Sequence, residues 1–180
     1  MKILVIDDRQ ENLDGAIAQL GGSHDVFTTA SYDMGNMLIS RGDSVENRKV
    51  ANLTAGRSIG SYSSWSNKHY EDFSAGVPWD VVLSDGMMPF DGFYHNSDWG
   101  TEKLVGYQLA LSAIAAGTRF VAVVFSNHHH QNAEGSILEE SSRIRDSFRF
   151  ANGAVLRFFQ DAGRKAESKD WAAVLNKLIG

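Results

Sequence analysis

Two short apolar runs in this chain of 180 residues each end in acidic residues. Near the N-terminus, Lys2–Ile6 runs directly into Asp7 and Asp8. In the middle of the chain, Val81–Ser84 runs into Asp85. Runs of this length and composition are typical of buried parallel strands, which all end at the same edge of their sheet. That edge is where open α/β sheets hold their ligands, so we expect three carboxylates to meet there.

The rest of the chain alternates between helical and strand-like patterns. Helices are expected over Gln10–Leu20, Tyr32–Ser40, Glu102–Ala116, Ala133–Phe148 and Lys169–Ile179, with Ser168 capping the last. Further strands are expected over His24–Thr29, Phe120–Phe125 and Val155–Phe159. Such alternation predicts an α/β fold, in which helices cover both faces of a doubly wound parallel sheet. We expect residues 1–180 to form a single three-layer domain of this kind.

A segment rich in Ser, Gly and aromatic residues, about 41–77, interrupts this alternation. A connection of this length is uncommon without a purpose. One interpretation is a hairpin that pairs Val50–Thr54 with Ser58–Ser63. Its aromatic residues favour a flap packed on the domain over a partner-binding surface, although both interpretations stay open. A second, shorter insertion covers residues 93–100.

Composition excludes several classes of protein. A net charge of -5 argues against general nucleic-acid binding, which needs a basic face. The sequence has no cysteine, which excludes disulfides and thiol chemistry. No apolar run approaches the roughly 20 residues that a membrane span needs, and the chain opens on a core strand without a signal peptide. We therefore expect a cytoplasmic protein.

The two acidic strand ends together resemble the receiver domain of bacterial two-component response regulators. The stretch Met87-Met88-Pro89-Phe90-Asp91-Gly92 is similar to the family's Met-Pro-x-x-Asp-Gly motif, with one residue fewer. The resemblance implies a flavodoxin-like fold, whose five parallel strands have the order 2-1-3-4-5. It also implies that Asp7, Asp8, Asp85 and the backbone carbonyl of Met87 bind Mg²⁺, and that Asp85 accepts a phosphoryl group.

The family's site also uses a hydroxyl after the fourth strand and a lysine after the fifth. Ser126 follows Phe120–Phe125 and fits the first position. No lysine directly follows Val155–Phe159, where only Arg157 or Gln160 could align. Arginine keeps the charge but carries it on a bulkier, planar group. We therefore expect phosphorylation to be slow or absent.

A run of three histidines, His128–His130, follows Ser126 at the same predicted edge. Neutral imidazole binds transition metals, and consecutive side chains cannot all face one ion, so His128 and His129 are the candidate ligands. Together with Asp8 and Asp85 they would favour zinc, nickel or manganese over magnesium. The alternative is a polar loop in which one histidine forms a hydrogen bond with the acidic residues.

Three functional hypotheses follow from these patterns. The favoured one is a stand-alone, receiver-like signalling module that docks with a protein partner, either a kinase or a downstream target. The second is a small metal-dependent phosphohydrolase that uses the three aspartates and His128–His130. The third is an interaction protein whose acidic pocket has no catalytic role. These hypotheses leave open whether the protein is an enzyme, and the favoured one is a protein that is not.

Overall fold

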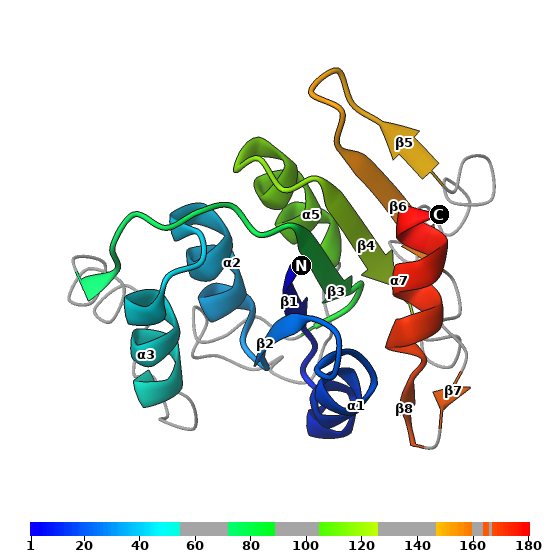
Figure 1. Cartoon of the computed structure of the whole chain (residues 1–180), viewed down its shortest axis with the longest axis horizontal. Coiled ribbons are helices and arrows are strands. Elements are labelled where there is room, and N and C mark those ends of the chain that lie inside the picture. Colours follow the sequence, from blue (N-terminus) through cyan, green and yellow to red (C-terminus); the bar gives the residue numbers. More distant parts are fainter. Residues whose placement is uncertain (55–71, 89–104, 126–146, 160–163, 166) are drawn as a thin grey trace, which may run out of the picture.

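The structure, a computed structural model, describes residues 1–54, 72–88, 105–125, 147–159, 164–165 and 167–180 (Figure 1). Its helices are α1 (Gln10–Leu20), α2 (Tyr32–Arg41), α3 (Val45–Thr54), α5 (Val105–Ala115) and α7 (Trp171–Ile179). Its strands are β1 (Lys2–Ile6), β2 (Asp25–Thr29), β3 (Val81–Asp85), β4 (Phe120–Val124), β5 (Ser147–Arg149), β6 (Val155–Phe159), β7 (Arg164–Lys165) and β8 (Ser168–Lys169). Within these residues, no helix is long and apolar enough to cross a membrane.

The main sheet has the strand order β2-β1-β3-β4-β6-β5. Its first five strands run parallel to one another. Since β6 is the predicted fifth strand, their order is the 2-1-3-4-5 of flavodoxin-like proteins, and the predicted fold class is confirmed.

The sheet has one strand more than the sequence predicts. Strand β5 pairs with β6 in the antiparallel direction, with Phe148 opposite Leu156. The expected helix Ala133–Phe148 is therefore wrong at its C-terminal end, and its residues before 147 lie outside the described part of the chain. The Phe148 ring packs edge-on against Phe158 at 6.0 Å, a contact that suits a strand on the sheet edge.

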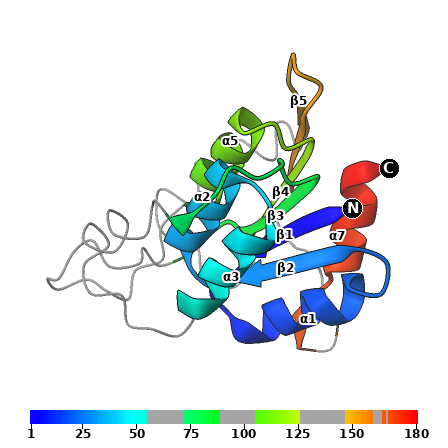
Figure 2. The same ribbon diagram turned by 60° about the vertical axis from the view of Figure 1, so that its left-hand side comes forward.

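Helices cover both faces of the sheet, so the central strands are apolar on both sides (Figure 2). On one face, Ile3 and Val5 pack in a cluster with residues of α1 and α7. On the other face, Leu4 and Ile6 pack with residues of α2 and α5. This arrangement gives the three layers that the sequence predicts.

The last helix starts later than expected. Asp170 caps α7 because its side chain accepts a hydrogen bond from the backbone amide of Ala173 (3.0 Å). The predicted cap, Ser168, and the predicted first helical residue, Lys169, instead form strand β8, which pairs with β7. This shift of two residues changes the interpretation of the functional site.

The inserted segment contains a helix where a hairpin was expected. Val50–Thr54 belong to α3, so the predicted hairpin is wrong there, and Ser58–Ser63 lie outside the described residues. The Ser44 hydroxyl accepts a hydrogen bond from the Asn47 amide (3.0 Å) and so caps this helix. Buried Asn47 also accepts from the Ser74 amide (2.9 Å), which joins the two ends of the segment.

Arg48 fastens α3 to the edge of the sheet. Its guanidinium forms two hydrogen bonds with Asp25 (2.6 and 2.9 Å) and one with buried Asp43 (2.5 Å). It also lies 5.6 Å from the ring centre of Phe27 and 5.2 Å from that of Trp79. The Arg48 hydrogen bonds lower the pKa of Asp25. Burial opposes ionisation of Asp43, but hydrogen bonds from Arg48 and other basic groups hold its pKa below the ordinary value.

Replacing Arg48 by Met should destabilise the protein by about 2 kcal/mol, because the Asp43 carboxylate stays buried with fewer donors. Chemical unfolding at pH 7 measures the change. Lys49→Met is the matched control, since it removes one positive charge from an exposed position of the same helix and should cost less than about 0.5 kcal/mol. Equal losses in both variants would show that Arg48 contributes only its charge.

Candidate active site at the carboxyl edge of the sheet

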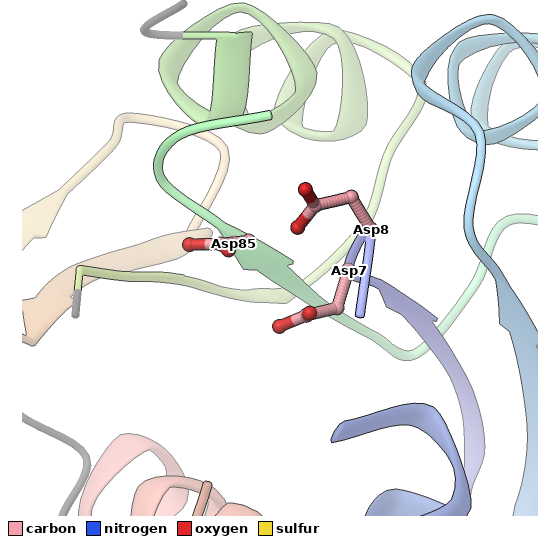
Figure 3. A group of neighbouring side chains, drawn as sticks. All are labelled: Asp7, Asp8 and Asp85. Atoms are coloured by element: carbon pink, nitrogen blue, oxygen red, sulfur yellow. The ribbon is translucent and has the colours of Figure 1, made fainter. Parts of the chain in front are cut away.

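The register of the parallel strands brings the three acidic residues together. Ile6 of β1 lies opposite Ser84 of β3, so Asp7 follows β1 at the level where Asp85 ends β3. One carboxylate oxygen from each of Asp7, Asp8 and Asp85 lies within 4.8 Å of the others (Figure 3). The predicted meeting of three carboxylates at this edge is confirmed.

Asp7 is held in place by donors on both of its carboxylate oxygens. It is fully buried, and Oδ1 accepts hydrogen bonds from the Arg9 amide (3.0 Å) and from Asn12 Nδ2 (2.9 Å). Oδ2 accepts from Lys169 Nζ at 2.6 Å. These contacts fix the orientation of the Asp7 carboxylate.

Asp85 is buried with a weaker set of partners. Its Oδ1 lies 3.1 Å from Lys169 Nζ and 3.4 Å from the Met87 amide. Burial raises the pKa of the Asp85 carboxyl to about 7, because Lys169 opposes the rise only in part and the Asp7 and Asp8 carboxylates add to it. Asp85 therefore exchanges its proton near neutral pH.

The start of α5 packs directly on the backbone of Asp85. A side chain at Gly106 would place its Cβ 2.2 Å from the Asp85 carbonyl oxygen, closer than any real contact. Glycine is therefore required at this position of α5. This close approach fixes the end of β3, and with it the phosphoacceptor that the resemblance implies.

Lys169 bridges the two buried carboxylates. Its side chain is 7% exposed, and its ammonium contacts Asp7 at 2.6 Å and Asp85 at 3.1 Å. Burial alone would lower the pKa of this ammonium, but Asp85 and Asp7 hold it above the ordinary value. The interpretation that the chain lacks a lysine at this site is therefore wrong. The lysine comes from β8 rather than from the end of the fifth strand of the sheet.

Arg157, the expected substitute for that lysine, lies elsewhere. Its guanidinium donates a hydrogen bond to the carbonyl oxygen of Lys177, which ties β6 to α7. The other expected residues after the fourth and fifth strands lie outside the described part of the chain: Ser126, His128, His129, His130 and Gln160. Their roles stay predictions.

The sequence does contain a signal for Lys169. Asp170 is as good a helix cap as Ser168, and an apolar stripe starts directly after it at Trp171. With Asp170 as the cap, Lys169 belongs to the connection that follows the fifth strand. A lysine in that connection is available to the carboxyl edge of the sheet.

The residues at this edge fit a divalent cation. Carboxylate oxygens are the ligands that Mg²⁺, Ca²⁺ and Mn²⁺ prefer, and each accepts more than one partner. The three carboxylates outnumber the Lys169 ammonium, so the ionised site has an excess of negative charge that a cation can neutralise. Met87, whose carbonyl is a predicted ligand, is buried directly after Asp85 and Gly86.

No family description and no curated protein sequence matches this chain. Among solved structures, it is similar to a response regulator receiver domain protein from Clostridium thermocellum, with 17% identity over 98% of this chain and 91% of that chain, and a TM-score of 0.40. It is also similar to the chemotaxis protein CheY4 of Vibrio cholerae, with 12% identity over 99% and 98% of the two chains and a TM-score of 0.43.

A third solved structure is the N-terminal domain of a response regulator/sensory box/GGDEF 3-domain protein from Carboxydothermus hydrogenoformans. Its identity is 12% over 75% of this chain and 72% of that chain, with a TM-score of 0.40. The fold assignment itself rests on the strand order.

Replacing Asp85 by Asn should stabilise the protein at pH 8. The folded pKa of about 7 lies above the ordinary value of 3.8 for this carboxyl, so between these two pH values the folded state holds the proton more tightly than the unfolded state. The contribution of Asp85 to stability is complete below about pH 4 and is lost as the pH rises through 7. Asparagine, which does not ionise, removes this loss.

Thermal unfolding at pH 5 and pH 8, with a chelator present, measures the effect. The melting temperature of Asp85→Asn should exceed that of the native protein by more at pH 8 than at pH 5. Asp14→Asn, at an exposed position of α1, is the control. A difference that does not change with pH would contradict the raised pKa.

Proposed function

We propose that this chain is a receiver-like signalling module in which Asp85 accepts a phosphoryl group. The observation that carries the proposal is the Lys169 ammonium, which contacts both Asp7 and Asp85 beside the third carboxylate, Asp8. A cation and an acidic cluster at the carboxyl edge of a flavodoxin-like sheet are what phosphoryl transfer to a carboxylate requires. Slow or absent phosphorylation was expected because a lysine was missing. With Lys169 beside Asp85, we propose instead that Asp85 is phosphorylated.

The chemistry assigns a separate role to each residue. An oxygen of ionised Asp85 attacks phosphorus, and the bond from phosphorus to the donor's leaving group breaks with its electron pair. Lys169 favours the ionised form of Asp85 and balances negative charge on the incoming phosphoryl group. A bound Mg²⁺ would add further positive charge for the phosphoryl oxygens.

Asp7, Asp8 and Asp85 would hold this metal ion, with the carbonyl of Met87 as a further predicted ligand. Backbone, amide and ammonium donors all contact the Asp7 carboxylate and orient it. Asp8 is only half-buried and is the most exposed of the three carboxylates. The protein partner is a kinase that supplies the phosphoryl group or a target that binds the phosphorylated module, in the cytoplasm.

Lys169→Met should slow phosphorylation by acetyl phosphate about 100-fold, because one charge that stabilises the transition state is lost. The reaction is followed by intact mass in millimolar magnesium, with Asp85→Asn as the variant that accepts no phosphoryl group. Arg157→Met is the matched control and should keep nearly the native rate, since Arg157 contacts the α7 backbone.

Two outcomes would contradict this assignment. A larger loss in Arg157→Met than in Lys169→Met would return the role to the arginine. Continuous release of phosphate over many turnovers would favour the metal-dependent phosphohydrolase instead.

The metal site predicts millimolar magnesium affinity that depends on Asp8. Asp8→Asn should weaken binding at least about tenfold, because a charged oxygen ligand is replaced by a neutral one. Calorimetry measures this affinity, and Asp14→Asn serves as control. The same titration with zinc, in the native protein and in a triple His128/His129/His130→Ala variant, tests the predicted histidine ligands. Unchanged zinc affinity in the triple variant would assign these histidines to the polar-loop alternative.

A further inference from the structure

Lys169 reaches the acidic cluster from a very short strand. Strand β8 has only two residues and pairs with the equally short β7. Such a pair is too small to fix a side chain by itself. The contacts that place Lys169 come instead from α1, which packs along β8.

Asn12 of α1 links the backbone of Lys169 to the acidic cluster. Its side chain is buried, and its Nδ2 donates to Asp7 Oδ1 at 2.9 Å. Its Oδ1 accepts from the backbone amide of Lys169 at 3.0 Å. The Asn12 carbonyl also accepts from Trp171 Nε1 at 2.8 Å. One amide group therefore contacts both the carboxylate and the residue that carries the ammonium.

Gln19, two turns later on α1, also contacts β8, and its hydrogen bonds are with β8 and α7 rather than with Asp7. Its Nε2 donates to the Lys169 carbonyl (2.9 Å) and to Ser168 Oγ (3.1 Å), and its Oε1 accepts from the Ala172 amide (3.1 Å). Gly15, between the two, lets β8 approach, because a Cβ there would lie 2.1 Å from Ser168 Oγ. Gln19 thus fixes β8 on α1, and its contacts are with β8 and the start of α7.

We infer that Asn12 is a positioning residue, which sets the distance between the Lys169 ammonium and the Asp7–Asp85 pair. Its two hydrogen bonds fix the distance between the Lys169 backbone and Asp7. From this position the Lys169 side chain contacts both carboxylates. Without Asn12, Lys169 keeps its backbone hydrogen bond with Gln19, but its position relative to Asp7 is no longer fixed. The effect on phosphoryl transfer to Asp85 rests on the proposed function, whereas the hydrogen bonds of Asn12 do not depend on it.

A double-mutant cycle with Asp85→Asn tests this inference. Asn12→Leu and Gln19→Leu each remove a side-chain amide that contacts β8, so they form a matched pair. If Asn12 holds Lys169 against Asp85, then Asp85→Asn at pH 8 should raise the melting temperature more in the Asn12→Leu background than in the native one. We expect an additional rise of about 3 °C or more, and an unchanged rise in the Gln19→Leu background.

The rate of phosphorylation by acetyl phosphate gives the second measurement. Asn12→Leu should be about tenfold slower than the native protein at saturating magnesium, and Gln19→Leu should stay within about threefold. If Asn12→Leu does not fold, Asn12→Ser replaces it, because a hydroxyl is too short to contact both Asp7 and the Lys169 amide.

Equal effects of Asp85→Asn in all three backgrounds would overturn the inference and leave Asn12 with a purely structural role. Absence of labelling in the native protein is a different result. It would reject the proposed phosphoryl transfer, and the melting temperatures would still decide whether Asn12 positions Lys169.

Discussion

The buried ammonium of Lys169 is the interaction on which this architecture depends. Asp7 and Asp85 are brought together by the register of β1 and β3, at a depth where water no longer screens their charges. Two carboxylates at such a distance cannot both ionise unless a cation lies between them. Lys169 supplies that cation, and removing it would leave at least one uncompensated charge inside the protein. Strand β8, held against α1, carries this lysine to the two carboxylates.

The balance of cations and carboxylates differs between the two edges of the sheet. At the amino edge, Arg48 and Lys2 face Asp25 and Asp43, so cations and carboxylates are matched and the cluster is structural. At the carboxyl edge, three carboxylates lie together with the Lys169 ammonium, and burial, aided by the charges of Asp7 and Asp8, raises the pKa of Asp85 to about 7. Excess negative charge of this kind costs stability unless another cation binds. The proposed function uses this imbalance to bind a metal ion.

The strands and the acidic cluster were predictable because both follow from local patterns. Apolar runs of fixed length identify β1, β3, β4 and β6, and parallel pairing then places Asp7, Asp8 and Asp85 together without further information. Lys169 was missed because its role depends on where a helix begins, and Ser168 and Asp170 compete as caps at that boundary. Strand β5 and helix α3 were missed because each is fixed by tertiary partners, Phe158 for the first and Asp25 with Asp43 for the second.

The origin of Lys169 shows why position along a chain is a poor guide to a site built from several elements. Arg157 lies on the strand where a lysine was sought, yet its guanidinium bonds to the backbone of α7. Lys169 follows a connection and a two-residue strand, yet its ammonium lies between the two carboxylates. The chemistry constrains where the charge lies in space and leaves open which element carries it. A short strand held on α1 by Asn12 and Gln19 can therefore replace a direct extension of the sheet, provided that its register against α1 is fixed.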